Sequence, residues 1–114
     1  GNKMVIDLSA GLPSGVNDVI CRINYKGDTG QGFVNGELVA DNFYNGIPWE
    51  IGLKRFLGTP DKKEMVFHFR PLYKDAVFLQ DFNPEEIPVF NKYDQFLEID
   101  KPEFFPEYQA KIRF

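Results

Sequence analysis

The residues best suited to chemistry lie between Asp41 and Glu50, in the segment DNFYNGIPWE. Its three aromatic rings are interleaved with amide and carboxylate side chains. An aromatic ring can cover the apolar C–H face of a pyranose, while planar amides and carboxylates bond its hydroxyl groups. The segment is therefore typical of sugar binding. The candidate binding residues are Asp41, Asn42, Tyr44, Asn45, Trp49 and Glu50.

A structural interpretation competes with sugar binding. In this interpretation Phe43 and Trp49 close one end of the fold, while Asn42 and Asn45 bond to their own backbone in turns. Because a chain with 16 % aromatic residues must bury most of its rings, the sequence favours the structural interpretation. Tyr44 is the residue that we expect to keep an exposed ring.

The sequence gives little support to a catalytic site or a zinc site. His68 is the single histidine, so a zinc site would need Asp or Glu for its other ligands. The lone Cys21 excludes an internal disulfide, and its strand-like surroundings predict a small buried apolar side chain. Ser9 and Ser14, the two serines, lie outside any GxSxG motif. Outward-facing strand or loop positions explain Glu37, Glu50, Glu64, Glu98 and Glu107, so we predict no catalytic carboxylate pair among them.

A calcium site is a disfavoured alternative. Asp41, Asn42 and Asn45 could supply the oxygen ligands that Ca²⁺ prefers, and loops of β-sandwiches commonly hold a structural ion. Their spacing does not match an EF-hand loop, so capping of turns is the favoured role. We expect no metal site and no cofactor.

Length and charge limit the class of protein. The 114 residues suit a single domain over residues 1–114, in which Gly1 has the character of a scar left by tag removal. Thirteen Lys and Arg against seventeen Asp and Glu give a net charge of −4, with the two signs interspersed. This argues against nucleic acid as a partner. No stretch of about 18 residues lacks charge, so no membrane span is predicted.

The spacing of prolines and glycines along the chain predicts an all-β fold. Eight prolines and ten glycines divide the sequence into short segments and disfavour long helices. Several of these segments alternate with period two, as half-buried strands do. The residues expected to face the core are Val19, Cys21, Ile23 and Tyr25, then Met65, Phe67 and Phe69. Near the end a further strand, expected to pair into a sheet, alternates through Tyr108, Ala110, Ile112 and Phe114.

Asn35-Gly36 is the strongest local signal, because a two-residue type I′ turn needs positive φ at both positions. The turn sets Val34 opposite Glu37 and Phe33 opposite Leu38. We expect Phe33 and Leu38 to face the core and Val34 and Glu37 to point outward. Between Val89 and Lys101 the pattern fits a short helical turn followed by a strand as well as it fits strand alone.

Three segments resemble the C-terminal region of bacterial β-galactosidases of glycoside hydrolase family 35. The longest is GDTGQGFVNGELVADNFYNGIPWEIGLKRF, and the other two are FHFRPLYKDAVFL and PEYQAKIRF. Together they cover more than half of the chain in the expected order. Residues Phe82 to Lys101 match less clearly.

The resemblance implies a jelly-roll-type antiparallel β-sandwich, galactose-binding-domain-like, appended to a catalytic barrel. The catalytic glutamates of that family lie on the barrel, so the resemblance assigns no catalytic residue here. It implies that the chain alone is not an enzyme and that its partner is the barrel of its parent hydrolase. Many such modules pack against the barrel and bind no sugar themselves, so contact with galactose-containing glycans is a hypothesis that the composition of the loop from Asp41 to Glu50 motivates. The resemblance also implies that the parent is exported to the periplasm or cell surface. An independent carbohydrate-binding module with Tyr44 and Trp49 as an open platform, and a stand-alone hydrolase, are the alternatives.

Overall fold

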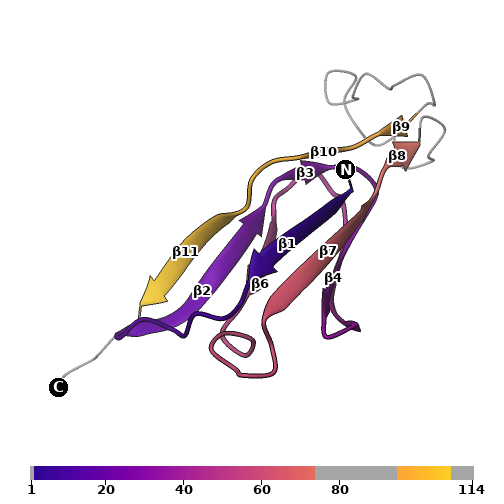
Figure 1. Ribbon diagram of the computed structural model, residues 1–114. Coiled ribbons are helices and arrows are strands. Elements are labelled where there is room, and N and C mark those ends of the chain that lie inside the picture. Colours follow the sequence, from indigo (N-terminus) through magenta and orange to yellow (C-terminus); the bar gives the residue numbers. More distant parts are fainter. Residues whose placement is uncertain (1, 74–94, 109–114) are drawn as a thin grey trace.

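The protein is all-β, as the sequence predicts, in the computed structural model that describes residues 2–73 and 95–108 (Figure 1). Within these ranges there is no helix, and thus no helix long and apolar enough to cross a membrane. The strands are β1 (Lys3–Asp7), β2 (Val16–Ile23), β3 (Tyr25–Lys26), β4 (Thr29–Val34), β5 (Glu37–Phe43), β6 (Trp49–Gly52), β7 (Glu64–Arg70), β8 (Leu72–Tyr73), β9 (Gln95–Phe96), β10 (Glu98–Ile99) and β11 (Glu103–Tyr108).

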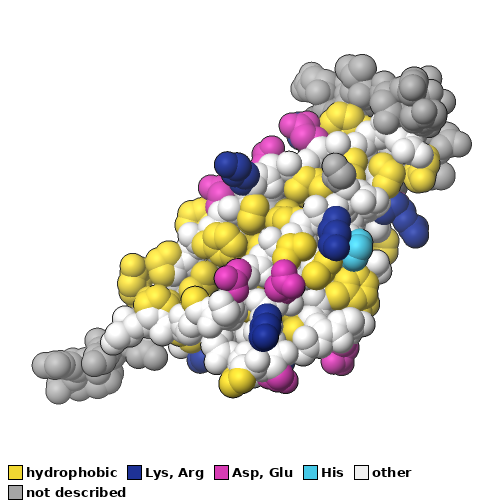
Figure 2. All heavy atoms as spheres, viewed as in Figure 1, with side chains coloured by type: hydrophobic (Ala, Val, Ile, Leu, Met, Phe, Trp, Pro, Cys, Tyr) yellow, Lys and Arg dark blue, Asp and Glu magenta, His cyan; other side chains and the backbone are white. Residues whose placement is uncertain are grey.

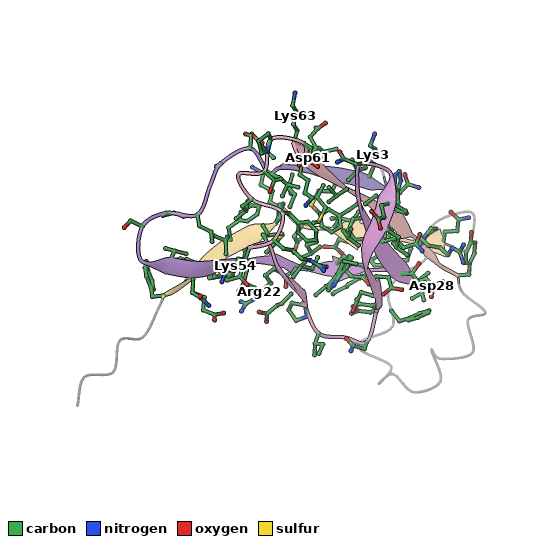
Figure 3. The ribbon with its side chains drawn as sticks, turned by 90° about the horizontal axis from the view of Figure 1, so that it is seen from below. Lys3, Arg22, Asp28, Lys54, Asp61 and Lys63 are labelled. Atoms are coloured by element: carbon green, nitrogen blue, oxygen red, sulfur yellow. The ribbon has the colours of Figure 1, made fainter. Side chains whose placement is uncertain are left out.

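Two antiparallel sheets form the body of the fold. The four-stranded sheet has the order β1-β7-β4-β5, and the three-stranded sheet has the order β11-β2-β6. Figure 3 shows them as two layers, with Lys3 directed away from one and Arg22 away from the other. The short pairs β3 with β10 and β8 with β9 continue the strands at one end (Figure 1).

The core lies between the two layers. It is built from the inward side chains of both sheets, of β3 and of the segments that follow β1 and β6, and it includes Ile6, Leu8, Cys21, Ile23, Tyr25, Val34, Trp49, Ile51, Leu53, Phe56, Met65, Phe67 and Phe69. The ring of Trp49 from the three-stranded sheet meets Phe67 from the other sheet edge-on, with centroids 5.5 Å apart. Contacts of this kind join the layers and hold the sandwich together.

The predicted alternations of β2 and β7 are confirmed. Cys21, Ile23 and Tyr25 are buried, and so are the three predicted residues of β7, while Val19 packs against the core from a partly buried position. His68 is exposed on the opposite face of β7, as its neighbours in the sequence predict. Burial raises the pKa of the Cys21 thiol to about 11, so this side chain is inert at neutral pH.

The hairpin turn and its register are confirmed, and Glu37 is exposed as predicted, but the predicted facing of the other three residues is wrong. Asn35 and Gly36 have φ of 52° and 77°, and Phe33 lies opposite Leu38 as expected. Val34, however, is buried, and Leu38 is 47 % exposed.

The cause of the reversal is the pairing of β4 with β7. Val34, Gly32 and Gly30 lie opposite Met65, Phe67 and Phe69, so the inward face of β4 carries two glycines. A Cβ atom on Gly32 would lie 3.0 Å from Cε1 of Phe67. The large rings of β7 fill the space over these glycines, which leaves Phe33 on the outer face.

Two sequence expectations fall partly outside the described residues. Of the segment Val89 to Lys101, residues 89–94 lie outside, and the rest contains β9 and β10. The expected C-terminal strand through Tyr108, Ala110, Ile112 and Phe114 lies outside the described residues apart from Tyr108, which is the last residue of β11, a strand that pairs with β2.

Candidate functional site

A hollow with a volume of about 190 Å³ opens where β3 and β10 meet the loop that follows β5. Three separate stretches of the chain line it. They contribute Asn24, Tyr25 and Lys26 from the β3 region, Tyr44, Gly46, Ile47 and Pro48 from the loop, and Glu98 and Asp100 from the β10 region. The hollow therefore includes part of the segment that the sequence singled out for sugar binding.

Tyr25 forms the inner wall of the hollow and is held firmly. Its hydroxyl accepts a hydrogen bond from the Asn42 side-chain amide at 2.7 Å and donates to the Asn42 carbonyl oxygen at 3.4 Å. Its ring contacts Phe69, Tyr44 and Trp49, with centroids 5.0, 5.6 and 6.3 Å away. Burial raises the pKa of Tyr25, so the phenol stays neutral and keeps its hydrogen-bonding role through the physiological pH range.

The loop between β5 and β6 places Tyr44 and Ile47 beside the hollow. The Tyr44 amide donates to the Asp28 carbonyl oxygen at 2.9 Å, which anchors the start of the loop to the chain before β4. The Asn45 carboxamide oxygen accepts from the Ile47 amide at 3.2 Å, and Gly46 has a φ of 89°. This side-chain turn leaves Ile47 64 % exposed.

Charged side chains from β3 and β10 complete the rim. Lys26 lies opposite Glu98 in the two-residue ladder between these strands, and all three charged residues of the rim, Lys26, Glu98 and Asp100, are exposed. The Asp100 amide donates to the Asn24 carbonyl oxygen at 3.0 Å, which fixes the chain beyond β10 against β3. One cation and two carboxylates thus face solvent around an aromatic wall.

This arrangement suits recognition of a polar ligand that also has an apolar face. Carboxylates and an ammonium group can bond hydroxyl groups from several sides, while the half-buried Tyr44 ring offers a surface for C–H groups. The lining contains neither histidine nor cysteine, and among the described residues no three metal-ligating side chains gather around a common point. The lining residues offer hydrogen bonds and apolar contact to a ligand.

The structure does not gather the six predicted binding residues into one site. Tyr44 lines the hollow, and Asn42 supports it from behind through Tyr25. Asn45 shapes the adjoining loop. Asp41 lies opposite Gln31 on β4, outside the lining of the hollow.

The other two predicted binding residues lie on β6. Glu50 pairs with Arg22 on the outer face of the three-stranded sheet, at 3.6 Å from its guanidinium. Trp49 is only 7 % exposed, so the prediction of an open platform built on Tyr44 and Trp49 is wrong. The core needs this ring between Tyr25 and Phe67.

The structural interpretation of the loop is correct for Trp49 and wrong for Phe43, which is 76 % exposed. Asn45 bonds to the loop backbone as that interpretation expected, whereas the Asn42 amide reaches the Tyr25 hydroxyl. Of the side-chain oxygen atoms proposed for calcium, that of Asn45 accepts a hydrogen bond within the loop.

Sequence reasoning missed Asn24, Lys26, Glu98 and Asp100. These residues come from segments more than seventy positions apart, and only the pairing of β3 with β10 brings them together. Each looks like an ordinary surface residue in its own segment. No local motif could have found them.

Comparisons with known proteins give no further guide to this site. No family model, no curated protein and no solved structure matches the chain.

Proposed function

We propose that this chain is a non-catalytic β-sandwich module of a β-galactosidase-like glycoside hydrolase, and that its hollow binds a galactose-containing glycan. The observation that carries the proposal is the hollow of about 190 Å³, in which Tyr44 lies among Lys26, Glu98 and Asp100. The resemblance of the sequence to family 35 β-galactosidases supplies the sugar class.

The size and composition of the hollow support a small saccharide. A shallow site of this volume accommodates about one sugar ring, which agrees with the modest affinity usual for exposed glycan sites. Galactose carries an axial hydroxyl that leaves one ring face largely apolar, and an aromatic side chain at the wall can cover that face. The two carboxylates and Lys26 then serve the hydroxyl groups at the rim.

Exposed apolar side chains beside the hollow support attachment to a larger protein. Phe43, the last residue of β5, is 76 % exposed, and Ile47, in the loop that also supplies Tyr44, is 64 % exposed. Large apolar side chains that project from a loop commonly lie in contact with another protein surface. In the proposed module they contact the catalytic barrel of the parent hydrolase, and the glycan site lies beside that contact.

Calorimetric titration of galactose, lactose and galactan fragments into the purified chain tests the glycan site. We expect saturable binding with a Kd in the high micromolar to millimolar range, and weaker binding of glucose and cellobiose. Absence of heat across the galactose series would contradict the glycan site.

Matched variants locate the site. Asp100→Asn and Glu98→Gln each remove one charged hydrogen-bond acceptor at the rim, and we expect each to weaken binding about tenfold. Glu107→Gln removes an exposed carboxylate on β11, outside the hollow, and is expected to leave binding unchanged. Equal losses in all three variants would show that net charge, rather than the hollow, controls the interaction.

A turnover assay distinguishes this proposal from a stand-alone hydrolase. We expect the purified chain to leave a chromogenic galactoside intact over many hours. Steady turnover by the purified chain that is abolished by a single carboxylate substitution would show that the chain is itself an enzyme.

A further inference from the structure

The free edges of the two sheets differ in their protection against pairing with another strand. The β5 edge has an irregular register near Gly32, β11 carries Pro106, and β6 is only four residues long. Irregular register, proline and short length each discourage edge-to-edge association. In the described part of the chain, β1 alone presents a regular five-residue edge without proline, glycine or a register shift.

The backbone of β1 directs its odd-numbered residues toward this open edge. On the inner side, the Asn2 carbonyl oxygen accepts from the Phe69 amide at 2.9 Å, and the Leu8 amide donates to the Lys63 carbonyl oxygen at 2.8 Å. Even-numbered residues of β1 therefore bond to β7, because hydrogen-bonded and non-bonded pairs alternate along an antiparallel ladder. The N–H and C=O groups of Lys3, Val5 and Asp7 face outward.

The sequence of β1 is complementary to itself in the antiparallel direction. When two β1 strands pair about a two-fold axis at Val5, the valines face each other, and Lys3 of each copy faces Asp7 of the other. Each of these pairs falls at a hydrogen-bonded position, where two residues exchange both backbone bonds. A parallel in-register arrangement would instead set lysine against lysine and aspartate against aspartate, which is unfavourable.

An apolar row on the outer face of the sheet ends at this edge. Cross-strand register aligns Val5 with Val66, Val66 with Phe33, and Phe33 with Leu38, one residue from each strand of the sheet. Val5 is 45 % exposed at the end of the row. Pairing of Val5 with its own counterpart would make one continuous apolar row across both copies.

The core-facing side of the structure is also uncovered next to the β1 edge. Phe104 on β11 lies opposite the buried Cys21, on the side of the sheet that faces the core, yet it is 49 % exposed. In Figure 1, β1 is the strand of the four-stranded sheet that lies toward β11, and Figure 2 shows hydrophobic side chains gathered over β11 beside it. The four-stranded layer ends before it covers β11, so a strand added to β1 would extend this cover.

From these features we infer that two copies of this chain associate through antiparallel pairing of their β1 strands, centred on Val5. The pairing joins the two four-stranded sheets into one and satisfies the outward backbone groups of Lys3, Val5 and Asp7. Such an interface is isologous and closes with two subunits. The partner is a second copy, because the order of charges along β1 matches its own reverse.

Charge-swap variants test the register. Sedimentation equilibrium of the chain from roughly 10 µM to 1 mM should show a monomer–dimer equilibrium. Lys3→Glu and Asp7→Lys each create two like-charged pairs in their own dimers, so each alone should dimerise at least about tenfold more weakly. An equimolar mixture of the two variants restores both opposite-charge pairs and should dimerise about as well as the unchanged chain.

Proline variants test the edge independently of charge. Val5→Pro removes an outward N–H without removing a bond to β7 and should abolish dimerisation, while circular dichroism reports an intact fold. Asp41→Pro places proline on β5 at the opposite edge of the same sheet and should leave dimerisation unchanged. A chain that stays monomeric up to 1 mM, a mixture no tighter than its single variants, or a dimer that survives Val5→Pro would each overturn the inference.

Discussion

Substitution of Gly30 by alanine gives the sharpest test of the packing between the two sheets. An added Cβ atom would lie 2.7 Å from Cζ3 of Trp49 and 3.0 Å from Cε1 of Phe69, and both rings are buried. Overpacking of this kind costs about 1 to 3 kcal/mol. Alanine also restricts the unfolded chain, which returns about 0.4 to 1 kcal/mol of stability. We expect a net loss of about 1 to 2 kcal/mol.

Urea unfolding followed by the fluorescence of Trp49 and by far-ultraviolet circular dichroism measures this loss. Trp49 is the single tryptophan, so the fluorescence signal reports the same contact that the substitution disturbs. For a domain of this size the melting temperature should fall by roughly 4 °C per kcal/mol. Gly11→Ala is the matched control, because nothing lies within 4 Å of its added Cβ atom and its stability should change by less than about 0.5 kcal/mol.

The sign of the change in stability shows whether close packing or local strand propensity dominates at Gly30. By strand propensity alone, alanine should be better than glycine in the middle of β4, so a purely local view predicts a gain in stability. A Gly30→Ala variant as stable as the unchanged protein would refute the close packing of Trp49 and Phe69 over Gly30. Partial rescue by Phe69→Leu in the same chain would strengthen the case, because the smaller side chain vacates the space beside the new methyl group.

Three further changes probe other parts of the fold. Asp18 Oδ1 accepts backbone hydrogen bonds from Val19, Leu53 and Lys54 at 2.7, 3.1 and 2.9 Å, so Asp18→Ala should lose about 1 to 3 kcal/mol in urea unfolding and Asp18→Asn less. Gly36→Ala should lose about 1 to 2 kcal/mol, since φ is 77° in the turn; a smaller loss than at Gly11 would contradict this. Burial raises the pKa of Cys21 to about 11, above that of an unfolded thiol near about 8.5. The unfolded chain therefore loses this proton first, so stability should fall between about pH 9 and 11, and Cys21→Ala should show a shallower fall.

The fold class and the local turn could be predicted because they depend on short-range chemistry. Proline and glycine spacing excluded long helices, and Asn35-Gly36 fixed the hairpin register. The facing of the hairpin could not be predicted, because it depends on which side of β4 meets the phenylalanines of β7. The sequence near Phe33 offers a large apolar side chain, and only the β7 pairing shows that glycine is needed on the other side.

The candidate site was predictable only in its loop. The aromatic and amide residues after β5 drew attention to Tyr44, which does line the hollow. Glu98 and Asp100 join the candidate site through the pairing of β10 with β3. This is a contact between distant segments, and neither segment has a sequence pattern that indicates it. Trp49 was ambiguous because the sequence of a short aromatic segment does not show whether its tryptophan is buried or exposed. Only the packing of the four-stranded sheet against Trp49 shows that its ring is buried.

The position of β11 has a consequence for synthesis. Within this domain β2 is synthesised early, and β6 can pair with one side of it soon afterward. Its other side waits for Glu103–Tyr108, which are made after every other described strand. Pairing between such distant segments is slow, and an unpaired central strand is prone to aggregation in the interval. A nascent chain released before Tyr108 is complete should therefore need chaperone protection that the finished chain does not.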